Sequence, residues 1–220
     1  MRHVADVSPG GTHDLSHPAR HGERVGTGAL TMPSVAQSFI DQSRTLLTAS
    51  HFPRIERCLE QLSDDNVWWR ANAESNSIGN LLLHLAGNAR QWIISGVGGA
   101  PDHRQRQQEF DERGSVPAAD ALARLRATVE EVDRVLAGVT AEELLERRTI
   151  QGCDVTVLEA IYQVVEHFSM HTGQIILLTK MWTGDLGFYD LTNGVPRPQW
   201  HGKRALPAID NRDRSSGREA

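Results

Sequence analysis

Two histidines four positions apart stand in a segment that otherwise reads as a buried helix. The segment "VVEHFSMHTGQI" spans residues 164–175 and contains His167 and His171. Side chains at positions i and i+4 of a helix are neighbours on one face. Burying two imidazoles costs desolvation energy, and the rings repel each other when both are protonated. A divalent cation bound to the neutral rings would remove both costs, although such pairs also occur on surfaces and in hydrogen-bonded cores.

A third histidine, His84, lies among leucines in "SIGNLLLHLAGNARQW". A polar stripe follows this predicted helix beside its apolar face, at Ser77, His84, Asn88 and Gln91. Polar residues on one line of so apolar a helix indicate a pocket. We therefore predict that His84, His167 and His171 form a metal site. The alternative is that each histidine is a hydrogen-bonded core residue.

Three histidines without an obvious fourth ligand also indicate a type of chemistry. Structural zinc sites are closed by four protein ligands, whereas catalytic sites keep a position for water or substrate. We expect one divalent transition metal, with zinc as the first choice and nickel as the second, because imidazole suits both ions. Such an ion can lower the pKa of a bound water or thiol and can polarise a carbonyl.

Three amide side chains lie close to the predicted ligands along the sequence. Gln163 and Gln174 are about one helical turn from the histidine pair, and Asn88 is one turn after His84. We expect them to orient the metal ligands or to contact a substrate. They could equally be polar residues at the rim of a helical bundle.

The segment 99–117, "GAPDHRQRQQEFDERGSVP", is polar and is predicted to be a loop. Its arginines, including Arg104 and Arg106, could close over a substrate as a lid and grip an anion, with Glu109 and Asp111 beside them. The simpler interpretation is a charged loop exposed to solvent.

Four segments with helical periodicity must position these residues. They cover about 34–62, with a break at Pro53, then 76–96, 118–137 and 155–183. Expected caps are Ser34, then Asn76 or Ser77, with Gly138 ending the third segment and Gly184 the fourth. Thr140 and Glu143 have the spacing of a capping box.

Strands are scarce in this pattern: at most a short extended pair is expected, Thr149–Ile150 with Val155–Thr156 around Gly152. The sequence therefore predicts an all-α four-helix bundle.

The last helix carries the longest apolar seam. Its predicted inward residues repeat at spacings of four and three: Val157, Ile161, Val164, Phe168, His171, Ile175, Leu178 and Trp182. A 4,3 repeat held over nearly thirty residues is typical of a helix packed in a bundle. His171 interrupts this seam at its middle.

The composition excludes several classes of protein. The net charge is -5 with both signs mixed, which argues against a general binder of nucleic acid or of anionic membranes. No apolar stretch reaches the length of a membrane span, and the N-terminus lacks the apolar centre of a secretory signal. The chain has only two cysteines, so a reducing cytoplasm is the expected compartment.

The chain is expected to contain one domain with two appendages. Residues 1–32 are rich in glycine, histidine and charge and are predicted to be a disordered extension. Translation starting at Met32 would omit residues 1–31. The bundle is expected over 33–190, followed by an irregular tail over 191–220.

The histidine motifs resemble those of the DinB/YfiT-like superfamily of metal-dependent proteins. The resemblance rests on "NSIGNLLLHLAGN" with His84 and on "EHFSMHTGQI" with His167 and His171. The elements "LLTKMWTGDLGFYD" and "RQRQQEFDERG" resemble one bacterial branch, and the likeness covers about residues 34–190. It implies a four-helix bundle with up-down-down-up connectivity, a three-histidine metal site and a homodimer.

Function is implied less sharply by this resemblance. Superfamily members include transferases that join a low-molecular-weight thiol to an electrophile, and a thiol-dependent isomerase. We expect a metal-dependent enzyme that activates a thiol or water for attack on a small-molecule electrophile. A metal-dependent hydrolase and a non-catalytic metal-binding, stress-related protein remain alternatives.

Overall fold

The computed structural model describes residues 33–192 and 194–200 of the chain. The predicted disordered extension (1–32) and residues 201–220 of the predicted tail lie outside the described residues. The described part is mostly helical, which confirms the expected all-α class.

The helices, in chain order, are α1 (Val35–Thr45), η1 (Leu46–His51), α2 (Phe52–Leu59), α3 (Asp64–Trp68), α4 (Ile78–Ala89), η2 (Arg90–Ser95), α5 (Arg106–Asp111), α6 (Ala118–Ala137), η3 (Glu143–Leu145) and α7 (Val157–Thr183). The strands are β1 (Arg147–Ile150), β2 (Cys153–Thr156), β3 (Tyr189–Asp190) and β4 (Arg197–Pro198). Two short antiparallel hairpins result, β1 with β2 and β3 with β4.

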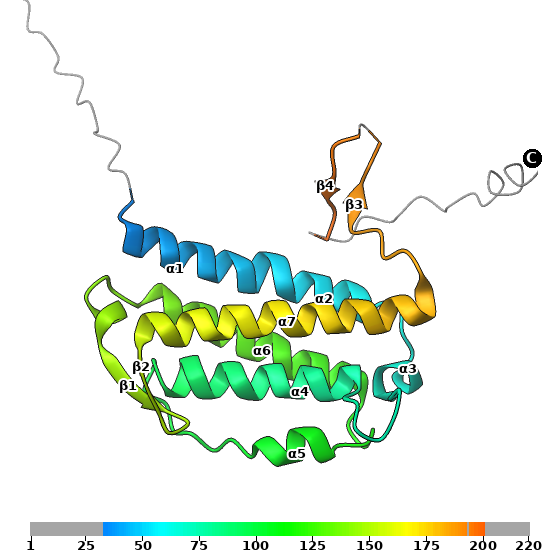
Figure 1. The fold of residues 1–220 in the computed structure, drawn as a ribbon, viewed down its shortest axis with the longest axis horizontal. Coiled ribbons are helices and arrows are strands. Elements are labelled where there is room, and N and C mark those ends of the chain that lie inside the picture. Colours follow the sequence, from blue (N-terminus) through cyan, green and yellow to red (C-terminus); the bar gives the residue numbers. More distant parts are fainter. Residues whose placement is uncertain (1–32, 193, 201–220) are drawn as a thin grey trace, which may run out of the picture. The chain divides into compact units, whose positions relative to one another are not determined.

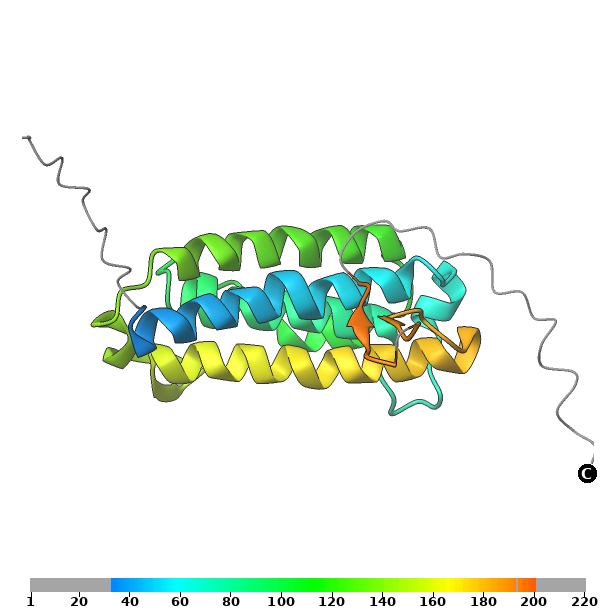
Figure 2. The same cartoon turned by 90° about the horizontal axis from the view of Figure 1, so that it is seen from above.

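Long helical segments pack side by side around one apolar core (Figures 1 and 2). They are α1–η1–α2, α4–η2, α6 and α7, and α4 contacts both α6 and α7. Each segment contributes fully buried side chains to the core, for example Ile55, Leu82, Leu125 and Phe168. Burial of such apolar surface is the main force that holds the helices together.

Helix starts follow the capping residues in the sequence. The Ser34 hydroxyl accepts a hydrogen bond from the Gln37 amide at 3.1 Å, and Ser77 forms a capping box with Asn80. Both predicted caps are therefore confirmed. The last helix begins at Val157 rather than just after Asp154, because residues 153–156 pair as β2. That predicted start was wrong by two residues.

The predicted break at Pro53 is a change of helix type rather than an interruption. The chain passes from α1 through the π-helical η1 into α2, which carries Pro53 in its first turn. Proline has no N–H to donate to the carbonyl four residues earlier, that of Ala49. The indole N–H of Trp200 donates to this oxygen at 3.1 Å. The segment predicted as an irregular tail thus contains a short strand, β4, and a buried tryptophan that packs against η1 and α2.

The predicted extended pair is present as the β1–β2 hairpin. Gln151 and Gly152 form its turn with φ values of 54° and 79°, and two consecutive residues with positive φ match the twist of a tight hairpin. The Trp92 indole N–H of η2 donates to the Gln151 side chain at 3.3 Å. The hairpin, which leads directly into α7, therefore contacts the C-terminal end of α4–η2. The end of α4–η2 thus lies near the start of α7, so these two helices run antiparallel.

The apolar seam of α7 is confirmed up to Ile175 and then shifts. Trp182 was predicted to face inward but is 48% exposed, whereas Thr179 is fully buried. An α-helix has 3.6 residues per turn, so a strict 4,3 repeat drifts around it over several turns. The inward face of α7 therefore moves from the predicted position 178 to position 179.

None of the helices within 33–192 and 194–200 has the length and apolar character that crossing a bilayer requires.

Candidate metal centre

The three predicted histidines meet between α4 and α7. One nitrogen from each of His84, His167 and His171 lies within 4.8 Å of the others. The Nε2 atoms of His84 and His167 are 2.9 Å apart, and the ring centroids are separated by 4.4–5.2 Å. These three residues, called the histidine cluster below, could hold a metal ion.

Hydrogen bonding favours one tautomer of His84. Its Nδ1 lies 2.9 Å from the Glu109 carboxylate and 3.2 Å from Nη2 of Arg104. A carboxylate only accepts, so the shorter contact favours the tautomer in which Nδ1 carries the proton and donates it to Glu109. Nε2 is then left with a free lone pair, which faces the other two rings. Carboxylate–histidine pairs of this kind orient metal ligands and raise their basicity.

His171 is fixed in the same tautomer by a different partner. Its Nδ1 lies 2.7 Å from the Gln174 side-chain oxygen, which accepts the Nδ1 proton. Its Nε2 is buried and has no hydrogen-bond partner within the described part of the chain. A buried polar atom without a partner costs free energy unless a ligand supplies one. This nitrogen faces the cluster, where an ion would satisfy it.

Burial also keeps the α7 imidazoles in the form that binds metals. Burial, together with the neighbouring His171, His84, Arg104 and Arg106, lowers the pKa of His167 to about 3. Burial lowers the pKa of His171 as well, although its bond to Gln174 opposes the shift. Both rings are therefore neutral near pH 7, as metal ligation requires. The cluster fits a divalent transition metal in its donor type, tautomers and protonation.

An arginine holds the carboxylate that supports His84. Arg104 donates through Nε and Nη2 to the two oxygens of Glu109, at 2.8 and 2.9 Å. Its Nη1 donates to Gln91, which lies two turns after His84 on the polar stripe. The side chains of Arg104 and Glu109 are only 5% and 8% exposed. Burial alone would raise the pKa of Glu109, but its bonds to Arg104 and His84 lower it, so the carboxylate stays ionised.

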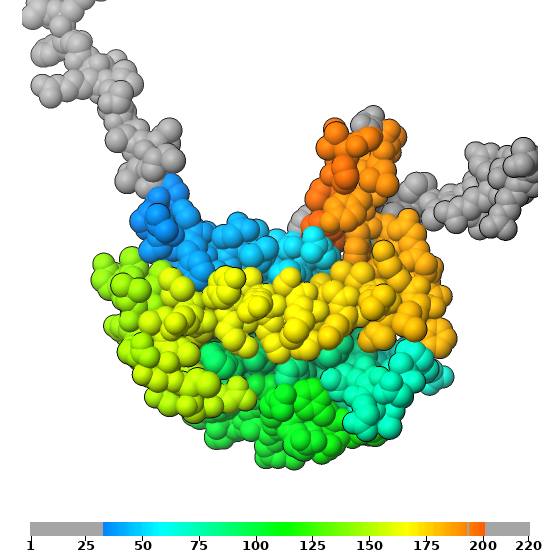
Figure 3. All heavy atoms as spheres, viewed as in Figure 1, coloured from blue at the N-terminus to red at the C-terminus, as the bar shows by residue number. Residues whose placement is uncertain are grey.

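Glu109 lies on α5, a helix within the segment 99–117 that was predicted to be a loop. Its close approach to α4 depends on Gly87, because a Cβ there would overlap the Glu109 carboxylate. Asn80 anchors α5 by donating to the backbone carbonyl of Glu109 at 2.8 Å. Arg70 in turn donates to the Asn80 side chain and to the Phe110 carbonyl. Figure 3 shows α5, in green, at the lower edge of the bundle, where it packs on α4.

A family model described as "Protein of unknown function (DUF1572)" matches residues 34–192. The chain belongs to this family. DUF1572 is DinB-like, as the histidine motifs indicated.

Solved structures support the same fold. A conserved protein from Enterococcus faecalis is 16% identical with a TM-score of 0.54, and the match covers 66% of this chain and 97% of the other. A DinB-like protein from Bacillus cereus ATCC 10987 is 18% identical with a TM-score of 0.51, covering 64% and 89%. At these identities the likeness concerns the fold alone. No curated protein matches the chain.

The two arginines proposed as a substrate lid have different surroundings in this DinB-like chain. Arg104 lies behind His84, and its charge is paired with Glu109. Arg106 lies 4.8 Å above the ring of Phe110, and Phe110 contacts the ring of His84. Arg104 therefore contacts the site through Glu109 and His84. Arg106 lies over Phe110, which itself covers the ring of His84.

The amide candidates also separate into two groups. Gln174 contacts a cluster histidine directly. Asn88 and Gln163 instead carry side-chain oxygens that are buried and lack a hydrogen-bond partner among the described residues. The sequence named all three amides as candidates. Glu109 was expected only beside the lid arginines, not as a partner of His84. The signal that could have found its role is Gly87, about one turn after His84 in a helix of large apolar residues.

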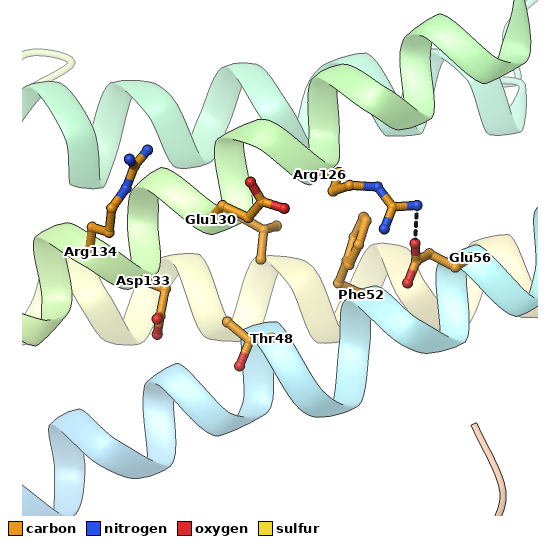
Figure 4. A pocket seen from close by; sticks show the side chains of 8 residues that line it. Thr48, Phe52, Glu56, Arg126, Glu130, Asp133 and Arg134 are labelled. Carbon is orange, nitrogen blue, oxygen red and sulfur yellow. Dashed lines mark ion pairs between the residues drawn. The ribbon is translucent and has the colours of Figure 1, made fainter. Parts of the chain in front are cut away.

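A hollow of about 490 Å³ lies elsewhere, between α1–η1–α2 and α6 (Figure 4). Arg126 pairs with Glu56 across it, and Asp133 accepts hydrogen bonds from Arg44. These charges already have protein partners. None of the cluster histidines lines this hollow.

Proposed function

We propose that this protein is a metal-dependent enzyme of the DinB/YfiT-like type that activates a thiol or water for attack on a small electrophile. The observation that carries the proposal is the buried, unpartnered Nε2 of His171 facing two more imidazoles. Among the described residues the cluster offers three nitrogen ligands and no carboxylate or thiolate as a fourth. A site with three protein ligands keeps a coordination position for a reactant.

Each residue has a defined task in this proposal. His84, His167 and His171 hold the ion, with zinc as the first choice and nickel as the second. The ion supplies a Lewis acid that lowers the pKa of a water or thiol at the open position. Glu109 keeps His84 in the correct tautomer, and Arg104 keeps that carboxylate ionised.

The finer description of the fold and the assembly belongs to the same proposal. We propose up-down-down-up connectivity, which the 22-residue connection between η2 and α6 supports, since it is long enough to return along the bundle. We also propose a homodimer. Exposed apolar side chains on α7, Met170, Leu177 and Met181, offer it a surface. The free cysteines, one of them exposed, suit a reducing cytoplasm.

The test begins with protein purified without a histidine tag. Elemental analysis is expected to find about one zinc or nickel per chain. Small electrophiles are then supplied with and without low-molecular-weight thiols, and products are identified by mass spectrometry. Thiol adducts would support transfer, and thiol-independent products would identify a hydrolase. Absence of stoichiometric metal, with no rise in Tm on adding zinc or nickel, would refute the proposal.

A further inference from the structure

Two amide side chains lie one helical turn from the histidine cluster, on different helices. Asn88 follows His84 by four residues on α4, and Gln163 precedes His167 by four residues on α7. Four residues correspond to a rise of about 6 Å along a helix. Each amide is therefore displaced from a metal ligand by the same step along its own helix.

Because α4 and α7 are antiparallel, both amides lie on the same side of the histidine cluster along the bundle. Trp92, near the end of α4–η2, donates to Gln151 in the hairpin that leads into α7. Moving from the cluster toward the end of α4 is therefore moving toward the start of α7. Asn88 and Gln163 lie at one level of the bundle, between the histidines and the Trp92–Gln151 contact.

Both amides have an unsatisfied acceptor. The Oδ1 atom of Asn88 and the Oε1 atom of Gln163 are buried, and no described residue donates to either. Asn88 is only 4% exposed, so solvent hardly reaches it. Buried amide oxygens normally receive a hydrogen bond. Two such oxygens at one level beside a site with an open ligand position indicate that a bound molecule supplies the donors.

We propose that Asn88 and Gln163 form an amide subsite, which accepts hydrogen bonds from a hydroxyl, amide or ammonium group of the substrate held at the histidine cluster. This inference rests on the proposed function and adds a substrate class to it. The substrate carries a donor group about one helical turn, or 5–6 Å, from the atom that binds the ion. A carboxylate cannot donate to these two oxygens, so it gains a hydrogen bond here only if an amide turns its NH2 group inward.

The partial exposure of the neighbouring α7 side chains gives such a molecule a way in. Gln163 and His167 are half-buried, whereas Asn88 and His84 are buried behind them. A small thiol entering beside α7 would meet the Gln163 amide and the His167 ring first. The donor group would then sit beside Asn88 while the sulfur reaches the cluster.

The experiment uses the full chain loaded with cobalt(II), whose absorption reports thiolate coordination directly. Three thiols of similar length are titrated: 3-mercaptopropan-1-ol, butane-1-thiol and 3-mercaptopropanoate. The alcohol and butane-1-thiol differ by a hydroxyl in place of a methyl group. We expect the alcohol to bind on the order of tenfold more tightly than butane-1-thiol, because only the alcohol satisfies a buried acceptor. The propanoate is expected to bind most weakly.

Variants tie this preference to the two amides. Asn88→Leu and Gln163→Leu are expected to abolish the preference for the alcohol while cobalt still binds. The control Gln107→Leu, on the exposed side of α5, is expected to keep it. Equal affinities for the alcohol and butane-1-thiol in the unaltered protein would overturn the inference. This outcome does not depend on whether the variants fold. Absence of cobalt binding would overturn the proposed function as well, so the two failures are distinguishable.

Discussion

The two helices that meet at the histidine cluster are supported in opposite ways. Behind His84, the contacts between α4 and α5 form a hydrogen-bonded network: Glu109 bonds to Arg104, Arg104 to Gln91, and Asn80 to Arg70. The Asn88 side-chain oxygen, one turn further along α4, is the unpaired acceptor on this side. On α7, Gln174 supports His171, but the Nε2 of that histidine and the side chains of Gln163 and Thr172 retain unpaired buried atoms.

This difference separates a preorganised half of the site from a half that needs a ligand. A satisfied buried network holds its members in one geometry. Unpaired buried groups are tolerated where binding later supplies their partners. The α4–α5 half therefore positions one nitrogen in advance, whereas the α7 half is completed by the ion and by whatever binds beside it.

Removing a ligand from the incomplete half is expected to have the largest effect. His171→Ala should abolish stoichiometric metal binding, because two imidazoles remain and no carboxylate or thiolate in the cluster can replace the third. In the unaltered protein, zinc at about 1,000 times its Kd would stabilise the fold by about 4 kcal/mol. In His171→Ala this stabilisation by zinc, and the rise in Tm that it causes, should disappear.

Elemental analysis and thermal melts with and without zinc measure this effect. His103→Ala is the matched control, because His103 is exposed in the connection between η2 and α5. A His171→Ala protein that still holds one zinc per chain would show that the cluster is not the metal site.

Breaking the preorganised half is expected to affect both stability and metal affinity. Glu109→Gln removes the charged acceptor of His84 and leaves Arg104 buried without its partner. Breaking a buried ion pair on one side costs about 3–5 kcal/mol. Losing a carboxylate that supports a metal ligand lowers metal affinity by about 10–100-fold. Denaturant unfolding and zinc titration against a competing chelator measure the two effects.

Two further variants separate these consequences. Arg104→Met combined with Glu109→Gln should recover much of the stability, because no unpaired charge remains, but it should not recover metal affinity. Gly87→Ala keeps both charges and displaces the Glu109 carboxylate by direct overlap, so it should also weaken metal binding. Unchanged zinc affinity in both variants would mean that Glu109 does not position His84.

The sequence predicted the α7 half better than the α4–α5 half, for a physical reason. His167 and His171 share one helix, so their meeting follows from helical geometry alone. The caps Ser34, Ser77 and Gly138 act through local hydrogen bonds or backbone conformation, so the local sequence is enough to predict them. Glu109 reaches its partner from a separate element, α5, whose six residues show too little periodicity to predict. Its placement depends on tertiary contacts through Asn80, which no local pattern records.

A fall in pH should destabilise the metal-free protein through its buried histidines. The pKa of His167 is lowered to about 3, and that of His51 in η1 to about 4, chiefly by burial. Histidines in an unfolded chain protonate near pH 6.5. Below that pH the unfolded state binds protons that the folded state does not, so stability is lost as pH falls from about 6.5 toward these values.

Melting temperatures of metal-free protein between pH 7.5 and pH 5 test this dependence. His167→Gln should reduce the slope, because burial lowers the pKa of this ring. His103→Gln changes an exposed side chain and should leave the slope unchanged. A Tm that stays constant over this range would contradict the burial of neutral imidazoles in the α7 half.

The smallest expected effect comes from the one partner that the α7 half does possess. Gln174→Leu removes the acceptor of the His171 Nδ1 proton, but Gln174 is exposed and water can take its place. Zinc affinity should fall by less than about tenfold, and stability should change by no more than about 0.5 kcal/mol. The same titration and unfolding measurements apply. A loss as large as that of Glu109→Gln would mean that the Gln174 bond holds His171 as rigidly as the buried carboxylate holds His84, and the contrast between the two halves would be wrong.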